Sequence, residues 1–306
     1  PSWVSYEPQS IILKKQYSYI NTSFENNWKI FPDLLVEKCE QIKGKKLLIL
    51  NYPGNPTGVS YSSSELEIIA NICRENNTII LSDEIYGRLH HTNNHQSIAK
   101  YFPEGTIITS GLSKWCGAGG WRLGTMVIPK KLQLIQDSIA AVSSETFSCV
   151  SSPVQYAAIT AFNNDKTIDN YLFHSRRILS AIGNYCSKIL SDARIKVHPP
   201  DGGFYLFADF SNYKDFFNSK NIKTSNQFCS QLLKDTGVAL LPGSVFGRPK
   251  EEFTARLAYV NFDGAEALRT SETLVDNNEL TIEDLIHIIK SLKSGISLIV
   301  DWLKTN

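Results

Sequence analysis

The sequence predicts an α/β protein in which a large domain with a mostly parallel sheet is followed by a smaller α+β domain. In the first half, short apolar runs typical of strands alternate with amphipathic helical segments, the order that parallel strands joined by right-handed crossovers require. In the second half, strand and helix patterns follow one another in mixed order. The chain has 306 residues, about twice the ~150 residues of an average domain. We therefore expect two domains, at residues 1–190 and 191–306.

Four apolar runs in the first half are expected to form buried strands. They occupy residues 47–50, 78–81, 107–109 and 125–128. Between the first two, residues 64–73 place apolar side chains at steps of three and four, which predicts a helix packed on the sheet. A similar pattern over residues 169–192 predicts a long helix. We place the domain boundary near the end of that helix.

The second half combines further strand signals with helices. Strands are expected at residues 195–197 and 203–208, where aromatic and β-branched residues are enriched, and again at 238–240 and 256–260. A helix is expected at 225–234. Thr281 is a candidate N-cap for a closing helix. The apolar stripe of that helix comprises Ile282, Leu285, Ile286, Ile289, Leu292 and Ile296.

Composition and charge exclude several classes of protein. A hydrophobic fraction of 42% with 20% charged residues is ordinary for a globular protein, and no apolar run approaches the ~18 residues that a membrane span requires. The 31 basic and 30 acidic residues are interspersed, without the basic patch of a nucleic-acid-binding protein. The six cysteines and six histidines lack the spacing of metal ligands. We therefore expect a cytoplasmic protein with reduced thiols that binds no metal, no membrane and no nucleic acid. A targeting segment upstream of the first residue is left open.

A lysine and an arginine lie eight positions apart in a turn-rich loop between two of the expected strands. Residues 110–122 are Ser-Gly-Leu-Ser-Lys-Trp-Cys-Gly-Ala-Gly-Gly-Trp-Arg, which contain Lys114 and Arg122. A neutral lysine amine attacks an aldehyde, and an arginine binds phosphate through charge-assisted hydrogen bonds. The glycines are not a dinucleotide fingerprint, because Arg122 occupies the third glycine position. The spacing suits a site for an aldehyde cofactor that carries a phosphate. The alternative for the segment taken alone is an ordinary loop with a solvated lysine.

Two strand ends carry further candidate ligands. Asn55 lies in the turn-rich segment 51–58, at the carboxyl end of the first strand, where open α/β folds bind ligands. Asp83 and Tyr86 follow the second strand. A carboxylate pairs with a protonated pyridine nitrogen and keeps the ring an electron sink, while a phenol donates to the ring phenolate. Taken singly, Asp83 could equally be a turn cap, and Asn55 could bond its own turn.

A third segment contains a candidate ligand for a carboxylate. Residues 242–247, Pro-Gly-Ser-Val-Phe-Gly, precede Arg256 on an expected strand. A guanidinium binds a carboxylate through two parallel hydrogen bonds. The alternative for Arg256 is a surface ion pair with Glu251 or Glu252.

These motifs, in this order, resemble the class I and II aminotransferases, the aspartate-aminotransferase-like enzymes of fold type I that use pyridoxal 5'-phosphate. The resemblance covers essentially all 306 residues. It implies that Lys114 binds the cofactor aldehyde and later transfers the substrate proton. It also implies that Asp83 pairs with the pyridine nitrogen, and that Tyr86 and Asn55 contact the ring oxygen.

The resemblance further implies ligands for the phosphate and for the substrate. Ser113 and Arg122 match phosphate ligands. Arg256 matches the arginine that binds the substrate α-carboxylate, with Asn55 as a second substrate contact. Trp3 falls where many relatives carry an aromatic residue that stacks on the pyridine ring.

Two departures from the family pattern stand out. The chain starts at proline, so roughly the first quarter of a family member is expected to be missing. That part would hold the amino-terminal arm, a helix N-terminus that receives the phosphate and a tyrosine that reaches the partner subunit's cofactor. The second departure is Gly111, where several relatives have a phosphate-binding serine. Ser110 and Ser113 are the two candidate replacements.

The resemblance implies an aminotransferase that exchanges an amino group between an L-amino acid and a 2-oxo acid by a ping-pong mechanism. It also implies a homodimer in which the partner completes each site. One alternative is another activity on the same cofactor, such as a C–S lyase, a decarboxylase or a synthase. The other is a non-catalytic regulator domain, which would normally be fused to a helix-turn-helix module that these 306 residues do not resemble.

Overall fold

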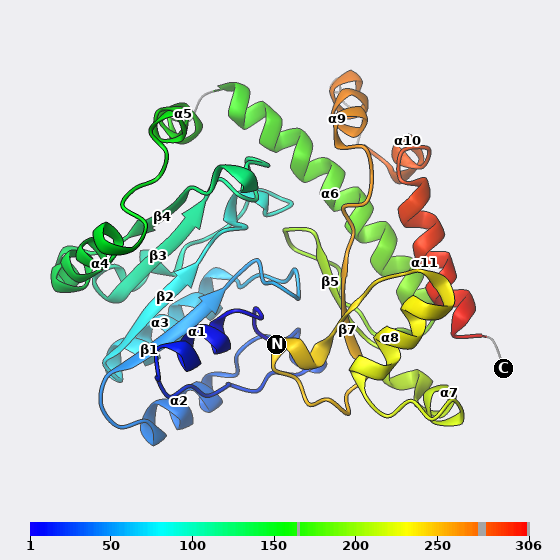
Figure 1. Ribbon diagram of the computed structural model, residues 1–306, viewed down its shortest axis with the longest axis horizontal. Helices are drawn as coiled ribbons and strands as arrows, with labels where there is room; N and C mark the ends of the chain where they lie inside the picture. Colours follow the sequence, from blue (N-terminus) through cyan, green and yellow to red (C-terminus); the bar gives the residue numbers. More distant parts are fainter. Residues whose placement is uncertain (164–165, 275–279, 305–306) are drawn as a thin grey trace. The chain divides into compact units, whose positions relative to one another are not determined.

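The computed structural model describes residues 1–163, 166–274 and 280–304 of the chain (Figure 1). Contacts between Cα atoms divide it into two compact units. Unit 1 comprises residues 1–29, 54–59 and 174–306, and unit 2 comprises residues 30–53 and 60–173. The division falls inside the long helix α6 (Lys166–Asp192), whereas the sequence places a domain boundary near the end of that helix. The domain ranges 1–190 and 191–306 stay a prediction.

Unit 2 contains a four-stranded sheet in the order β1–β2–β3–β4. The strands are β1 (Lys46–Asn51), β2 (Thr78–Asp83), β3 (Thr106–Gly111) and β4 (Gly124–Val127). The pairs β1–β2 and β2–β3 are parallel, and β3–β4 is antiparallel. The predicted mostly parallel sheet is thus confirmed. Its register aligns Asn51 with Asp83 and Asp83 with Thr109, so the carboxyl ends of three strands meet at one edge.

The two outer strands of this sheet are less buried than the apolar runs predicted. Leu47 in β1 is 55% exposed, and Met126 and Val127 in β4 are 45% and 61% exposed. The prediction of buried strands at 47–50 and 125–128 was therefore wrong in part. Met126 and Val127 are consecutive and therefore point to opposite faces of the sheet, so side chains on both faces of β4 are exposed.

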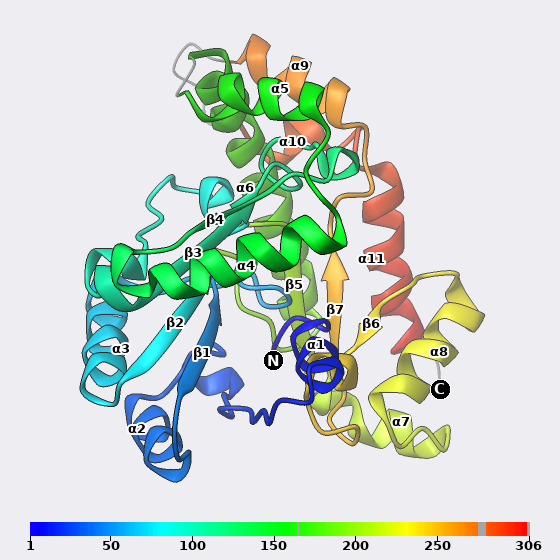
Figure 2. The same cartoon turned by 60° about the vertical axis from the view of Figure 1, so that its left-hand side comes forward.

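Helix α3 (Ser63–Glu75) confirms the helix predicted between the first two strands. It begins at Ser62, whose hydroxyl accepts a hydrogen bond from the backbone N–H of Glu65, while the Glu65 carboxylate accepts from the backbone N–H of Ser62. Its buried residues, Leu66, Ile69, Ala70 and Cys73, repeat at helical spacing. α3 contacts β2, and α2 (Pro32–Gln41) packs against α3 (Figure 2). After β4 follow α4 (Gln133–Thr146) and α5 (Ser152–Phe162).

Unit 1 contains a three-stranded antiparallel sheet in the order β5–β7–β6. The strands are β5 (Tyr205–Asp209), β6 (Leu241–Pro242) and β7 (Thr254–Ala258). The strand predicted at 195–197 is a single bridge from Lys196 to Asp209, the last residue of β5, so no ladder continues from it. The strand predicted at 238–240 lies a little further along the chain, where only two residues pair with β7.

Unit 1 also contains, in chain order, α1 (Tyr6–Ile12), α7 (Lys214–Ser219), α8 (Ser225–Thr236), α9 (Gly264–Thr273), α10 (Ile282–Leu285) and α11 (Lys290–Trp302). Helix α8 contacts β6 and β7 of this sheet, and α11 packs against α8. Thr281 is the N-cap of α10 as predicted, and its backbone N–H donates to Asp284 Oδ2 at 2.9 Å, as in a capping box. The single closing helix that was predicted is instead two helices. The N–H groups of Ile288 and Ile289 both donate to the carbonyl of Leu285, which closes a turn between them.

Among the described helices, none combines the length and the apolar character needed to cross a bilayer.

Candidate active site

Lys114 lies in a tight loop that joins β3 to β4, between strand ends as the sequence predicts. The loop is closed by hydrogen bonds from Gly117 N–H to the Lys114 carbonyl, at 3.1 Å, and from Ala118 N–H to the Leu112 carbonyl, at 3.1 Å. Trp115 anchors it, because its side chain is 1% exposed and packs against Phe162 with ring centroids 5.6 Å apart. The lysine backbone is therefore held at a defined place beside the sheet.

The amine of Lys114 lies over the ring of Tyr86, with Nζ 5.9 Å from the ring centroid. Tyr86 is 2% exposed and follows β2 by three residues. The structure thus brings two predicted site residues together from separate strand ends of unit 2.

Asp83 is the last residue of β2 and lies at the carboxyl edge of the sheet. Its carbonyl accepts a hydrogen bond from Asn51 Nδ2 at 2.8 Å, and its Oδ1 accepts from Ile85 N–H at 3.4 Å. The backbone N–H of Glu84 donates to the Thr109 carbonyl at 2.9 Å. The alternative interpretation of Asp83 was a turn cap, and that cap is present as the long hydrogen bond from Ile85 N–H. The Asp83 carbonyl and the Glu84 N–H are hydrogen-bonded to the neighbouring strands β1 and β3.

Arg122 ends the short 3₁₀ turn Gly119–Trp121 in the left-handed region, with φ +55°. A non-glycine residue in that region costs roughly 1–2 kcal/mol. Its Nη1 donates to the Gly119 carbonyl at 3.0 Å, and its side chain is exposed.

Gly111 has a steric reason to lack a side chain. A Cβ added there would lie 2.7 Å from the Leu123 carbonyl oxygen and 3.1 Å from the Cα of Gly124. The close approach of β3 and β4 thus accounts for the departure from the family's serine. The two candidate replacements for that serine lie at different places. Ser110 lines a cavity of about 290 Å³ together with Glu84 and His95, whereas Ser113 lies directly before Lys114 in the loop.

In unit 1 the structure joins two other predicted residues. Arg256 Nη1 on β7 donates to Asn55 Oδ1 at 2.8 Å, and Asn55 is 7% exposed. The Arg256 guanidinium lies 4.3 Å from the ring centroid of Tyr205 and 5.1 Å from that of Phe246. The guanidinium is therefore held by an amide and two aromatic faces.

The ion-pair alternative for Arg256 is not what the chain forms. Glu252 pairs instead with Arg248 through two hydrogen bonds of 2.8 Å. Glu251 lies 4.0 Å from Lys250. Trp3 is half-buried in the turn before α1, with its ring edge-on to Tyr6 at 5.2 Å between centroids.

Sequence reasoning missed two groups of contacts. Tyr205 and Phe246 were recognised only as strand and turn residues, although both contact Arg256. His95 was treated as a residue without a role, yet it pairs with Glu84 beside Asp83. The only signal for the second pair was the acidic doublet after β2. Within the described parts of the chain, no group of three histidine, cysteine or acidic side chains could hold a metal ion.

Comparison with known proteins gives the same family throughout. Residues 1–268 match the family described as aminotransferase class I and II. The chain is 33% identical over 264 residues to an asparagine–oxo-acid transaminase of Streptococcus mutans, and 34% identical over 263 residues to an aspartate aminotransferase of Bacillus sp. YM-2. Each match covers 85% of this chain and 64% of the relative, so the chain spans less than two thirds of the length of these curated relatives.

A solved structure shows the same fold. The aromatic aminotransferase of Pyrococcus horikoshii superposes with a TM-score of 0.81 and 26% identity, over 99% of this chain and 71% of that one. This confirms the predicted fold class, the fold type I architecture of pyridoxal-phosphate transferases. With a family match over 268 of its 306 residues, the chain belongs to the class I and II aminotransferases.

Proposed function

We propose that this chain is the greater part of a pyridoxal 5'-phosphate-dependent aminotransferase that exchanges an amino group between an L-amino acid and a 2-oxo acid. The observation that carries the proposal is the position of the Lys114 amine over the buried Tyr86 ring, in the loop after β3 and next to the end of β2. The curated relatives named above are an asparagine–oxo-acid transaminase and an aspartate aminotransferase, which supports amino transfer as the reaction of this chain.

The side chains of unit 2 fit this cofactor by their chemistry. An aldehyde needs an amine, a ring oxygen needs a donor and a pyridine nitrogen needs a carboxylate, and Lys114, Tyr86 and Asp83 supply these three groups. A phosphate needs a hydroxyl and a guanidinium, which Ser113 and Arg122 supply from the same loop. We favour Ser113 over Ser110 because Ser110 lines the cavity beside Glu84.

The bound cofactor would supply an electron sink for negative charge at the substrate Cα. In the proposed mechanism, the Asp83 carboxylate holds a proton on the pyridine nitrogen, and the Tyr86 hydroxyl donates to the ring oxygen. Lys114 Nζ accepts the proton from the substrate Cα and delivers it again later in the reaction. Asn55 and Arg256 bind the substrate, and Trp3 is the proposed stacking residue.

Amino transfer is tested by following nitrogen from donor to acceptor. The full protein, loaded with pyridoxal 5'-phosphate, is given a panel of ¹⁵N-labelled amino acids with a 2-oxo acid acceptor, and products are identified by mass spectrometry. We expect the label in the new amino acid. Release of labelled ammonia or of carbon dioxide without transfer would identify a lyase or a decarboxylase. Cofactor binding without turnover of any donor would identify a regulator domain.

Arg256→Ala is expected to lose roughly 3 to 5 kcal/mol of transition-state binding for an amino-acid donor, because two charge-assisted hydrogen bonds to the α-carboxylate are removed. Arg256→Lys should recover little of this, because an ammonium lacks the planar fork of the guanidinium that lies over the Tyr205 and Phe246 rings. The measurement is half-reaction kinetics with an amino acid and with the matching amine that has no carboxylate.

The control for this prediction is Arg248→Ala. Arg248 also lies over an aromatic ring, at 5.1 Å from the Trp28 centroid, but its partner is the Glu252 carboxylate. Its loss should leave the preference for carboxylate-bearing donors intact. If Arg256→Ala keeps that preference as well, Arg256 has a structural role and another cation binds the carboxylate.

We also propose a homodimer. Helix α4 has no buried residue, and large apolar side chains on α4 and after it are exposed, among them Leu134 at 82%, Val142 at 63% and Phe147 at 62%. Contiguous apolar surface of this kind marks an interface. Sedimentation equilibrium should give twice the mass of the chain, and Leu134→Glu with Val142→Glu should give the monomer. A monomeric wild type would contradict the proposal.

A cytoplasmic, reducing compartment is the setting we propose. All six cysteines are free thiols. Burial raises the pKa of Cys73, Cys186 and Cys229 to about 12, so these thiols stay protonated and unreactive. Structural thiols without disulfides are typical of reducing compartments.

A further inference from the structure

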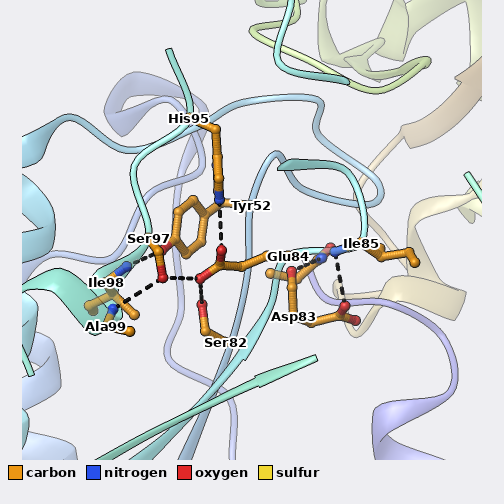
Figure 3. Close-up of polar contacts among 10 residues, drawn as sticks. Tyr52, Ser82, Asp83, Glu84, Ile85, His95, Ser97, Ile98 and Ala99 are labelled. Atoms are coloured by element: carbon orange, nitrogen blue, oxygen red, sulfur yellow. Dashed lines mark hydrogen bonds and ion pairs between the residues drawn. The ribbon is translucent and has the colours of Figure 1, made fainter. Parts of the chain in front are cut away.

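The carboxylate of Glu84 is the centre of a nearly buried polar network directly after Asp83 (Figure 3). Its side chain is 10% exposed. Its Oε1 accepts hydrogen bonds from Ser82 Oγ at 2.9 Å and from Ser97 Oγ at 2.6 Å, and its Oε2 lies 2.9 Å from His95 Nε2. Because a carboxylate only accepts hydrogen bonds, the imidazole is the donor to Oε2.

The segment that carries His95 is itself held in place. Ser97 Oγ accepts from Ala99 N–H at 3.2 Å, and Tyr52 Oη accepts from Ile98 N–H at 2.7 Å. The ring of Tyr52 is fully buried and lies 5.2 Å from that of His95. Burial raises the pKa of Tyr52, and the nearby Glu84 carboxylate raises it further, so the Tyr52 side chain stays a neutral phenol. The imidazole is thus fixed by its own segment as well as by its partner.

The same imidazole lies against Gly87. A Cβ added at Gly87 would be 2.8 Å from His95 Cδ2 and 2.9 Å from Nε2, so no side chain fits between them. Gly87 N–H donates to the Glu84 carbonyl at 2.9 Å, which makes Glu84 and Gly87 the two ends of one turn. Tyr86 lies inside this turn, and Asp83 immediately precedes it.

We propose that His95 is a positioning residue that clamps the turn 84–87, with its Nε2 hydrogen-bonded to the carboxylate of Glu84 and its Cδ2 and Nε2 edge packed against Gly87. The clamp keeps Asp83 and Tyr86, on either side of Glu84, at a constant separation. The benefit to the reaction rests on the proposed function, since that is where Asp83 and Tyr86 act on one cofactor. The clamp itself is a property of this chain without any cofactor.

The clamp is tested first by hydrogen exchange on the cofactor-free full protein. His95→Ala should speed exchange of the Gly87 and Leu89 amides, which donate to Glu84 and Tyr86, by about tenfold or more, since a hydrogen bond to a charged group is lost. Gly87→Ala should do the same, because its methyl group displaces the ring. In the double variant the two effects should not add, because the ring that the methyl group would strike is absent.

Two further variants keep this test sharp if His95→Ala does not fold. His95→Gln retains an N–H donor for Glu84 and should restore slow exchange. His287→Ala is the matched control, since His287 pairs with Glu266 at 3.6 Å on the surface, with about half of each side chain exposed. It should change nothing. Additive effects in the double variant, or fast exchange in His95→Gln, would overturn the clamp.

The positioning role is tested second, through cofactor affinity and the kcat/KM split of the half-reaction. His95→Ala should weaken binding of pyridoxal 5'-phosphate about tenfold and lower kcat with KM for the amino acid unchanged, and His95→Gln should recover both. Wild-type protein that does not bind the cofactor would contradict the proposed function and leave the exchange result standing. Faster exchange in His95→Ala with wild-type affinity and kcat would overturn the positioning role.

Discussion

Lys114→Ala is expected to abolish both amino transfer and the covalent retention of cofactor after borohydride reduction. The variant lacks the amine that lies over Tyr86 and that we propose to bind the cofactor aldehyde. The alanine side chain has no nucleophilic group that could form this bond instead. Loss of a positioned general base alone costs about 10²- to 10⁴-fold, and here the same group also forms the covalent bond. We expect activity below detection.

The measurement is mass spectrometry of the reduced, digested protein together with turnover of a ¹⁵N-labelled donor. Lys100→Ala is the matched control, because the Lys100 amine also lies over an aromatic ring, at 5.6 Å from the Tyr101 centroid, in the same unit. The control should retain the cofactor adduct on the peptide that contains Lys114. An adduct of normal yield in Lys114→Ala would show that another lysine binds the aldehyde.

Asp83→Asn is expected to bind the cofactor nearly normally and to remove the substrate α-proton about 10² times more slowly, or worse. A neutral amide cannot stabilise a charged pyridine nitrogen, whereas an opposite charge close by shifts such an equilibrium by one to three pKa units. The main chain should be little affected, because the strand-end contacts at Asp83 use its carbonyl and the N–H of Glu84.

The measurement is single-turnover exchange of the substrate α-deuterium, with cofactor affinity determined in parallel. Asp209→Asn is a close control. Asp209 also ends a strand, β5, and its Oδ1 also accepts from the N–H two residues later, at 2.8 Å. It should leave the exchange rate unchanged. An Asp83→Asn variant with the wild-type rate would remove Asp83 from the proposed site.

Local patterns in the sequence were sufficient to locate the four strands of unit 2, helix α3 and the loop with Lys114. Each depends on residues near one another in the chain: an apolar run bounded by turn residues, apolar side chains at steps of three and four, a lysine among glycines. The carboxyl ends of parallel strands meet at one edge, so the neighbourhood of Asp83 followed from strand order alone. The roles of the site residues came from family resemblance and remain predictions.

Only the tertiary structure decided which partners hold the candidate site residues. Arg256 donates a hydrogen bond to Asn55 across 201 positions of chain and lies over the rings of Tyr205 and Phe246, whereas the only partner within the chain that the sequence suggested was a nearby glutamate, as an alternative. Likewise, the exposure of β4 depends on which segments pack over that strand, and the pattern of apolar residues within the strand holds no information about those segments. Propensity and spacing act over a few residues, whereas the burial of a charge and the choice of its partner depend on packing between segments distant in sequence.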